Sequence, residues 1–410
     1  MRRLSALLLI GVVLASAESA GASEPGEELT ISLLTMGPGE HPFTKFGHTA
    51  IWVHDATSER DEVYNYGTFS FDSPTALLDS VAGKLPYWLS AQSLPGTLRS
   101  YREQGRSLTA SELELTPAER VALANALREN ERPEHRYYRY DYFRDNCATR
   151  VRDVIDRVIG GKVHEQSAQP ASMSYRSHML RLVASDPLLY SGLDVAVGRQ
   201  ADVPIAFWDE AFLPQRLHDL LAATQVERDG RPVSLIRSER SLIEGTVTLP
   251  AAQPPNWIAR YQGLGLALGA LFAGLGLLAK RTAAGRVLLG ALYLTFGLVL
   301  GLLGTALCYL TFFSAHSAAA SNYNVLLVPP WALALGISGV GVMRGKPRAL
   351  RVALWSTMAA FAATDAALVL HLATRDPQAN GQELAVALPL WIGAAAAAFF
   401  LAGPKTKTAP

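Results

Sequence analysis

The sequence contains very little cysteine and no excess of charge of either sign. Its 410 residues include two cysteines, Cys147 and Cys308. Lysine and arginine together number 37 and aspartate and glutamate 36, so the net charge is +1. Proteins that bind nucleic acid usually carry a basic excess, so this balance argues against a nucleic-acid partner.

Several motifs with recognisable chemistry are also missing. Neither cysteine has another cysteine or a histidine at metal-ligand spacing, which argues against a metal site. The chain has no glycine-rich phosphate loop and no Gly-x-Ser-x-Gly elbow, so its motifs do not indicate nucleotide binding or serine-hydrolase chemistry. We therefore expect no metal and no other cofactor.

The N-terminus has the pattern of a secretory signal. A basic start is followed by an apolar run from Leu4 to Ala15, and small residues then offer cleavage sites at 15–17 and 20–22. The run is too short to cross a bilayer comfortably as a helix. We assign residues 1–22 to a signal peptide and expect residues 23–255 outside the cytoplasm; a retained N-terminal anchor is the alternative.

Residues 256–410 have the composition of a transmembrane domain. Basic segments follow the first and third of its apolar runs and the last run, whereas the opposite loops carry almost no basic residues. The basic side of a membrane protein is cytoplasmic, so we expect an inner (cytoplasmic) membrane protein with its soluble domain on the periplasmic side. Five runs are long enough to span a bilayer: Tyr261–Ala279, Val287–Phe312, Val325–Met343, Val352–Ala373 and Leu384–Ala402.

Residues 23–255 have the mixed patterns of an α+β domain. Thr116 followed by a proline predicts a helix over Pro117–Asn130. Thr75–Leu94 is expected to be helical in parts, and Val233–Leu249 is expected to form a hairpin. Strands are predicted at Leu29–Leu34, Gly47–Val53, Glu62–Gly67 and Ser107–Leu115.

Cys147 is the one cysteine of the exported part, and it stands at a predicted helix start. Asp145 and Asn146 offer N-cap side chains, and Ala148–Ile159 has helical periodicity. Unpaired N–H groups and the helix dipole at such a start favour thiolate over thiol. A lone thiol in an oxidising compartment is either buried or used. We interpret Cys147 as a nucleophile; a buried structural cysteine is the alternative.

His48 is the strongest candidate for the base that a thiol nucleophile needs. It begins a predicted strand, which would hold its ring rigid. The return strand of the same hairpin carries Asn65, which would orient the imidazole if the register puts both side chains on one face. Tyr64 and Tyr66 flank Asn65 and are predicted to contact substrate. The predicted catalytic residues are therefore Cys147, His48 and Asn65.

Several blocks of this region resemble signature blocks of the Lnb periplasmic-domain family. They are Phe46–Ile51, Val63–Phe69 and Asp145–Arg150, and the resemblance continues through Gly83–Leu89 and Phe212–Pro214. The asparagine–cysteine block with a histidine upstream is also similar to the permuted NlpC/P60-like, papain-related fold of lecithin:retinol acyltransferase-type enzymes. The resemblance implies a permuted NlpC/P60 (papain-like) α+β domain followed by an all-α five-helix transmembrane domain.

The same resemblance implies thiol-dependent N-acylation of lipoproteins. An acyl chain would pass from a membrane phospholipid to Cys147 as a thioester, and then to the N-terminal amine of a lipoprotein. Polar residues at the outer ends of the spans, namely His316, Asn322 and Asp365, are predicted to line the path of the lipid. Two alternatives stay open: a cell-wall amidase or endopeptidase that uses the same residues, and a non-catalytic envelope scaffold.

Overall fold

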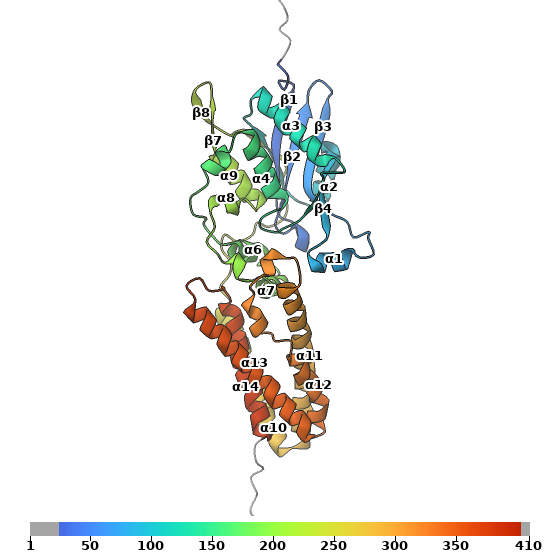
Figure 1. Cartoon of the computed structure of the whole chain (residues 1–410), viewed down its shortest axis with the longest axis vertical. Coiled ribbons are helices and arrows are strands. Elements are labelled where there is room, and N and C mark those ends of the chain that lie inside the picture. The colour runs from blue at the N-terminus through green and yellow to red at the C-terminus, as the bar shows by residue number, and fades with distance from the viewer. Residues whose placement is uncertain (1–23, 403–410) are drawn as a thin grey trace, which may run out of the picture.

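The computed structural model describes residues 24–402, which form two parts stacked along one long axis (Figure 1). The upper part is a mixed α+β domain, and the lower part is a bundle of apolar helices. The predicted order, an α+β domain followed by a helical membrane domain, is confirmed. The predicted signal peptide and the C-terminal lysines lie outside the described residues.

A seven-stranded antiparallel sheet forms the frame of the α+β domain. Its order is β6-β4-β3-β2-β1-β5-β9, and β7 and β8 form a separate hairpin. The central position belongs to β2, which begins at His48, and β3 with Asn65 lies next to it. The strands are β1 (Leu29–Met36), β2 (His48–Asp55), β3 (Arg60–Thr68), β4 (Pro86–Ser93), β5 (Leu108–Leu113), β6 (Tyr137–Arg139), β7 (Gln225–Arg228), β8 (Arg231–Ser234) and β9 (Ile236–Ile243).

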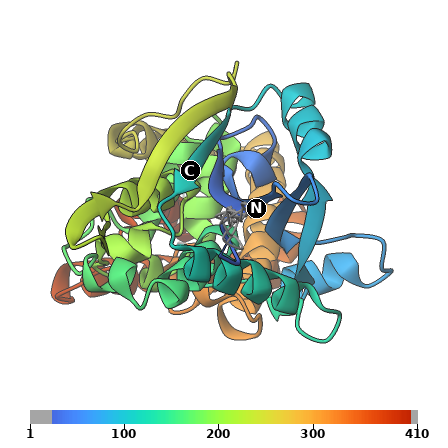
Figure 2. The ribbon, with the colours of Figure 1, turned by 90° about the horizontal axis from the view of Figure 1, so that it is seen from above.

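Side chains alternate between the two faces of this sheet, as an extended backbone requires. Ile51 and Val53 of β2 face a core shared with α4, whereas Ala50 and Trp52 face the opposite side. Helices lie on both sides of the sheet when the molecule is seen along its long axis (Figure 2). The covering helices are α3 (Pro117–Glu131), α4 (Cys147–Val158) and α9 (Pro214–Ala223) on the first face and α2 (Leu94–Glu103) on the second.

Short helices occupy the region between the sheet and the bundle. In Figure 1, α6 and α7 lie at the junction of the two parts, and α1 projects beside it. The bounds are η1 (Pro42–Thr44), α1 (Ala76–Ala82), α5 (Lys162–Glu165), α6 (Tyr175–Val183), α7 (Pro187–Ala196), η2 (Arg199–Ala201) and α8 (Phe207–Glu210).

Local sequence signals predicted the start of a helix correctly where the helix has a strong cap. The helix predicted after Thr116 is α3: the Thr116 hydroxyl accepts from the Glu119 N–H (3.2 Å), and the Glu119 carboxylate accepts from the Thr116 N–H (2.8 Å). The helix predicted after Asn146 is α4. The four predicted strands are confirmed as β1, β2, β3 and β5.

One local prediction is confirmed and another is wrong, because long-range pairing decides part of these segments. Thr75–Leu94 is helical in part, as predicted, since it contains α1; its second half is the strand β4, whose Leu89 is buried in the core. Val233–Leu249 is not a hairpin, since β8 returns onto β7 and β9 pairs with β5. The actual hairpin turn is Asp229-Gly230, with positive φ at both residues (50° and 71°), as a two-residue turn of this kind requires.

The lower part contains five helices of unequal length. Within residues 24–402, four helices are long and apolar enough to cross a membrane. The fifth, α12, has 12 residues and packs closely on α11: a Cβ added to Gly297 would lie 2.2 Å from the Gly336 nitrogen. Small residues allow this close approach of backbones in membrane helices. The helices are α10 (Ile258–Arg281), α11 (Ala283–Phe312), α12 (Ala332–Met343), α13 (Pro347–Ala373) and α14 (Gly381–Ala402).

The prediction of one continuous helix over Val325–Met343 is wrong. Its first residues belong to the 3₁₀ turn η4 (Tyr323–Leu326), and α12 begins at Ala332. The intervening Pro329-Pro330 pair explains the break, because proline has no N–H to donate and restricts the residue before it. The segment between α11 and α12 is therefore irregular, with η3 (Ser317–Ala319) at its start.

The arrangement predicts the orientation of the chain in the membrane. Arg286 lies beside Gly345, so the turns that carry the basic residues meet at the end of the bundle remote from the sheet. We expect topology reporters fused at Ala283 and at Gly345 to behave as cytoplasmic, because basic turns stay on that side. A reporter fused at Thr57, in the β2–β3 turn, is the external control. A periplasmic signal from the Ala283 fusion would contradict this orientation.

Candidate active site

Cys147 is held at the first position of α4 by a complete capping arrangement. The Asn146 amide oxygen accepts from the N–H groups of Ala148 (2.8 Å) and Thr149 (3.0 Å), and the Thr149 hydroxyl accepts from the Asn146 N–H (2.7 Å). The Asn146 amide nitrogen also donates to the Phe212 carbonyl oxygen (2.9 Å). Such a cap stabilises a helix start by about 1 kcal/mol and, here, also fixes the sulfur.

The thiol of Cys147 is buried and faces several hydrogen-bond donors. Burial raises the pKa of the thiol, although the backbone N–H groups of Thr49 and Ala148 and the hydroxyl of Tyr140 act to lower it. The expectation that the helix start favours thiolate is therefore wrong for this conformation, because the loss of hydration exceeds the effect of the donors. The resting group is a neutral thiol.

His48 and Asn65 form the pair that the hairpin register left open. The His48 Nε2 atom lies 3.2 Å from the Asn65 amide oxygen, and the Asn65 amide nitrogen donates to the Val63 carbonyl (3.0 Å). That second bond fixes the orientation of the amide, so its oxygen faces the ring and Nε2 carries the hydrogen. The neutral imidazole then keeps the lone pair of Nδ1 free to accept a proton.

Burial sets the charge of this histidine. Burial lowers the pKa of His48 to about 4, the Asn65 hydrogen bond opposes this change, and the Arg106 charge adds to it. The ring is therefore neutral throughout the ordinary pH range, which suits a general base. In residues 24–402 the hydrogen bonds do not include one between the His48 ring and the Cys147 sulfur.

The Cys147 sulfur lies at the start of β2, where β2 and β3 separate. By alternation, His48 lies on the α2 face of β2, whereas α4 packs on the other face. Pairing between β2 and β3 begins only at Ile51 and Tyr64, so Thr49 has no partner in β3 and its N–H faces the sulfur. Gly67, with φ of +90°, lies against the Cys147 side chain. The gap between the strands thus admits the Cys147 side chain next to Thr49, the residue that follows His48, and Arg106 lies near enough to act on both His48 and Cys147.

Arg106 is a residue of this site that the sequence did not reveal. Its side chain is 3% exposed, stacks on Tyr101 (4.7 Å from the ring centre) and donates through Nε to the Gly37 carbonyl (2.8 Å). Its Nη2 atom is buried and, among the described residues, has no hydrogen-bond partner. Burial lowers the pKa of Arg106, and the neighbouring Cys147 opposes this effect. A buried guanidinium with a free N–H group can therefore stabilise negative charge near the sulfur.

A narrow crevice lies next to the thiol at the junction with the membrane domain. The His316 ring stacks on Tyr142 with 5.9 Å between centroids, and Ser317 bonds to Asp141. Tyr140, which donates toward the Cys147 sulfur, is part of the wall. The lining residues include Gly83, Leu85, Tyr87, Tyr140, Tyr142 and His316. A wider groove near His54 and Asp61 lies toward the opposite end of the sheet, and Cys147 is not among its lining residues.

The structure places the other predicted substrate-binding residues elsewhere. Tyr64 and Tyr66 are buried in the core, where Tyr64 donates to Glu62 and the Tyr66 oxygen accepts from Asn130. Asp365 is exposed on the outer surface of α13 and does not line the crevice. Of the five residues predicted to contact substrate, His316 alone is among the crevice-lining residues.

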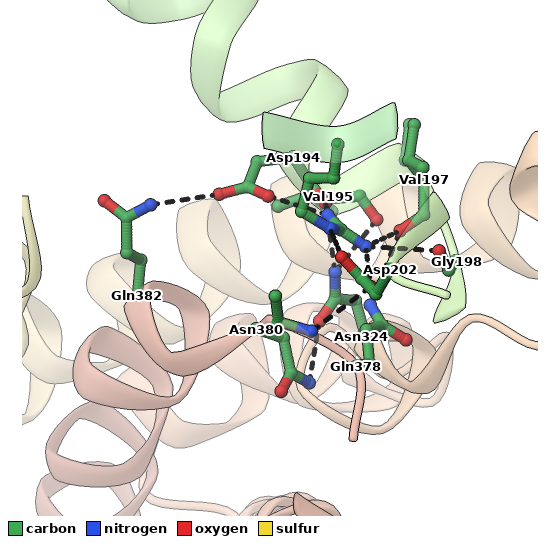
Figure 3. Close-up of polar contacts among 12 residues, drawn as sticks. Asp194, Val195, Val197, Gly198, Asp202, Asn324, Gln378, Asn380 and Gln382 are labelled. Atoms are coloured by element: carbon green, nitrogen blue, oxygen red, sulfur yellow. Dashed lines mark hydrogen bonds and ion pairs between the residues drawn. The ribbon is translucent and has the colours of Figure 1, made fainter. Parts of the chain in front are cut away.

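Asn322 has a different role, because it joins the α+β domain to the bundle. Its amide nitrogen donates to the carbonyls of Val195 (2.8 Å) and Ala196 (3.0 Å), and Asn324 also donates to Val195 (3.1 Å). These carbonyls belong to the last turn of α7, where a helix has no internal donors for them. Gln378, from the segment between α13 and α14, supports Asn322 by donating to its amide oxygen (3.1 Å). Figure 3 shows this junction, with Val195, Asn324 and Gln378 labelled.

A buried ionic cluster anchors the same end of α7. The Arg176 guanidinium donates to Asp194 and to Asp202, each at 2.7 Å, and also to the Val197 carbonyl (2.8 Å). Gln382 of α14 reaches Asp194 from the membrane side (3.3 Å). The α+β domain is thus attached to the outer end of the bundle through polar contacts that are shielded from water.

The fold and the site define a membrane protein that carries a thiol-bearing α+β domain on a bundle of apolar helices. The Lnb N-terminal periplasmic domain family matches residues 18–184, and the Lnb transmembrane domain family matches residues 257–374. The chain belongs to the Lnb family, and its α+β domain is periplasmic. Membership implies a membrane-associated enzyme of lipoprotein maturation. The chain matches no curated protein and no solved structure.

The helix-end contacts predict a measurable effect of Asn322. Asn322→Leu should leave the Ala196 carbonyl without a donor, at a cost of about 1–3 kcal/mol. Hydrogen exchange of the full-length protein should then become faster over residues 194–198 while the sheet stays protected. Asn125→Leu, at an exposed position of α3, is the matched control. Unchanged exchange over 194–198 would show that these bonds do not hold the junction.

The protonation state of the site predicts how Cys147 reacts with a small alkylating agent. Because burial raises the thiol pKa and His48 stays neutral, the thiolate fraction near neutrality is small. Alkylation by iodoacetamide in a Cys308→Ala background should therefore rise about tenfold per pH unit from pH 6 to pH 8. A rate that is already constant above pH 6 would instead indicate a thiolate–imidazolium pair at rest.

Proposed function

We propose that this protein is a thiol acyltransferase that moves an acyl chain from a phospholipid to the N-terminal amine of a lipoprotein. The observation that supports this most is the position of Cys147 at a capped helix start. Its thiol faces the N–H of Thr49, which follows His48 of the His48–Asn65 pair, and the hydroxyl of Tyr140, which lines a crevice at the junction with the bundle. A cysteine, a histidine and an asparagine also form the site of papain-like thiol enzymes. The permuted NlpC/P60-like assignment of the domain is part of this proposal.

The first half of the proposed reaction loads the thiol. His48 Nδ1 accepts the proton of Cys147, and the sulfur attacks the carbonyl carbon of a phospholipid ester. The carbon–sulfur bond forms, the ester carbon–oxygen bond breaks, and the lysophospholipid oxygen takes the proton from the imidazolium. The products are an acyl thioester on Cys147 and a lysophospholipid.

The second half transfers the chain to the acceptor. The α-amino group of a lipid-modified N-terminal cysteine attacks the thioester carbonyl, and His48 takes a proton from the attacking nitrogen. The carbon–nitrogen bond forms, the carbon–sulfur bond breaks, and the sulfur regains a proton from His48. The lipoprotein leaves with an N-acyl chain, and Cys147 returns to its neutral thiol.

Fixed donors would stabilise the negative charge that develops in both halves. The N–H groups of Thr49 and Ala148 already point toward the sulfur, and the buried Nη2 atom of Arg106, whose charge acts on His48, has no partner among the described residues. Donors that are in place before the reaction stabilise its transition state without reorganisation. These donors are needed because Cys147 and His48 are both neutral at rest and do not form a thiolate–imidazolium pair spontaneously.

The location of the crevice favours a lipid donor over a wall peptide. It opens between the aromatic segment Tyr140–Tyr142 and His316, which follows the outer end of α11. A phospholipid ester would lie near that depth, whereas a hydrolase of wall peptides has no need of a crevice at the junction with membrane helices. We further propose that the protein resides in the inner membrane, with residues 23–255 as its periplasmic catalytic domain.

The test is the reaction of purified full-length protein in phospholipid nanodiscs with a diacylated lipoprotein. Mass spectrometry should find an acyl thioester on Cys147 and an N-acylated lipoprotein product. Cys147→Ser should lower product formation by roughly 10³-fold or more, because the nucleophile is lost. The variant should keep its melting temperature, since the substitution is nearly isosteric.

Cys308→Ser is the matched control and should react like the parent protein. An unchanged rate for Cys147→Ser would rule out the thiol mechanism. Cleavage of wall peptides by the parent protein, without any acyl chain on Cys147, would favour the hydrolase instead.

A further inference from the structure

The helix α1 and the loop before it expose an apolar surface that the rest of the chain does not cover. Leu77 and Leu78 are each 70% exposed, and Val81 on the next turn is 46% exposed. Phe71 in the preceding loop is 48% exposed. Soluble surfaces rarely gather large apolar side chains in this way, so such a patch marks a contact with something apolar. We call Phe71, Leu77, Leu78 and Val81 the α1 patch.

The patch lies at the outer end of a membrane span. The Ala82 carbonyl accepts from the Ala315 N–H (2.8 Å), and the Ser80 carbonyl lies 3.0 Å from His316 Nε2. Ala315 follows shortly after Phe312, where α11 ends. These contacts fix α1 at the level where the chain leaves the bundle, and Figure 1 shows it at the junction of the two parts.

The surface of the span continues toward the patch with exposed aromatic residues. Phe312 is 65% exposed and Phe313 is 75% exposed at the end of α11. In Figure 2, α1 and its loop project sideways from the domain, so the bundle does not lie beneath all of them. The exposed apolar residues of α1 therefore lie near the exposed aromatic end of a membrane span.

Charged side chains beside the patch suit the boundary between lipid and water. Lys84 is exposed directly after the helix, and the Arg139 guanidinium donates to the Ala315 carbonyl. Lysine and arginine at the edge of an interfacial helix interact with lipid phosphates. The nearby acids are Asp72, which bonds to Ser70, and Asp79, which is half-buried.

We propose that the α1 patch inserts into the outer leaflet of the bilayer, with α1 in the plane of the interface. Leu77, Leu78 and Val81 then lie at the acyl boundary, and Lys84 lies at the depth of the phosphates. This contact is separate from the five helices of the bundle. It holds the crevice wall formed by Gly83 and Leu85 at the level of the headgroups.

The test measures depth by spin labels on the full-length protein in nanodiscs of phosphatidylethanolamine and phosphatidylglycerol. Single cysteines are introduced as Leu77→Cys, Lys84→Cys and Thr57→Cys in a Cys147→Ser, Cys308→Ala background. Leu77 and Lys84 are exposed, so their replacement disturbs little packing, and Thr57 in the β2–β3 turn at the far end of the sheet is the control. Oxygen, which concentrates in the bilayer, and a water-soluble nickel chelate serve as relaxation agents.

The label at position 77 should be relaxed by oxygen and shielded from the nickel chelate. The label at position 84 should be intermediate, and the label at position 57 should be accessible to nickel. Equal nickel accessibility at positions 77 and 57 would overturn the proposal. Shielding of position 77 from both agents would also overturn it, because the patch would then be covered by protein. The measurement needs no catalysis, so its result stands apart from that of the proposed acyl transfer.

Discussion

The carbonyl groups at the C-terminal end of α7 need donors, and the membrane domain provides them. A helix leaves its last carbonyls without internal partners, and burying them unpaired would cost about 1–3 kcal/mol each. Asn322 and Asn324 from the segment between α11 and α12 meet this need, supported by Gln378 from the segment between α13 and α14. Because the donors and acceptors come from different halves, neither half satisfies its buried polar groups alone. These contacts therefore fix the position of the α+β domain on the bundle.

This constraint also explains why the third apolar run is not one long helix. A helix over the whole run would use the backbone of residues 325–331 internally and would move the donors away from α7. The Pro329-Pro330 pair prevents that outcome, and the released chain folds back as short turns. The same irregular segment carries His316, whose ring stacks on Tyr142 at the crevice. The irregular segment between α11 and α12 therefore contributes both to the attachment of the α+β domain and to the crevice.

The features that sequence predicted are those that neighbouring residues determine. The cap at Asn146, the capping box at Thr116 and the long apolar runs are local patterns, and the structure contains them. The hairpin order brought His48 and Asn65 together, although their register could not be read in advance. Arg106, the strand β4 and the outward position of Asp365 depend on packing between distant segments. No local pattern carries that information, so these parts required the structure.

The charge state of the site also depends on packing, and it bears on how a lone thiol survives outside the cytoplasm. Oxidants attack thiolate much faster than thiol. Burial raises the pKa of Cys147 and lowers that of His48, so both changes oppose the ion pair. In the proposed reaction, an arriving acyl chain would displace water from the crevice and present a carbonyl group that takes up the charge. Arg106 and the backbone donors then stabilise charge that exists only while substrate is bound. Reactivity would thus be confined to the loaded site, and the unloaded thiol would stay protected.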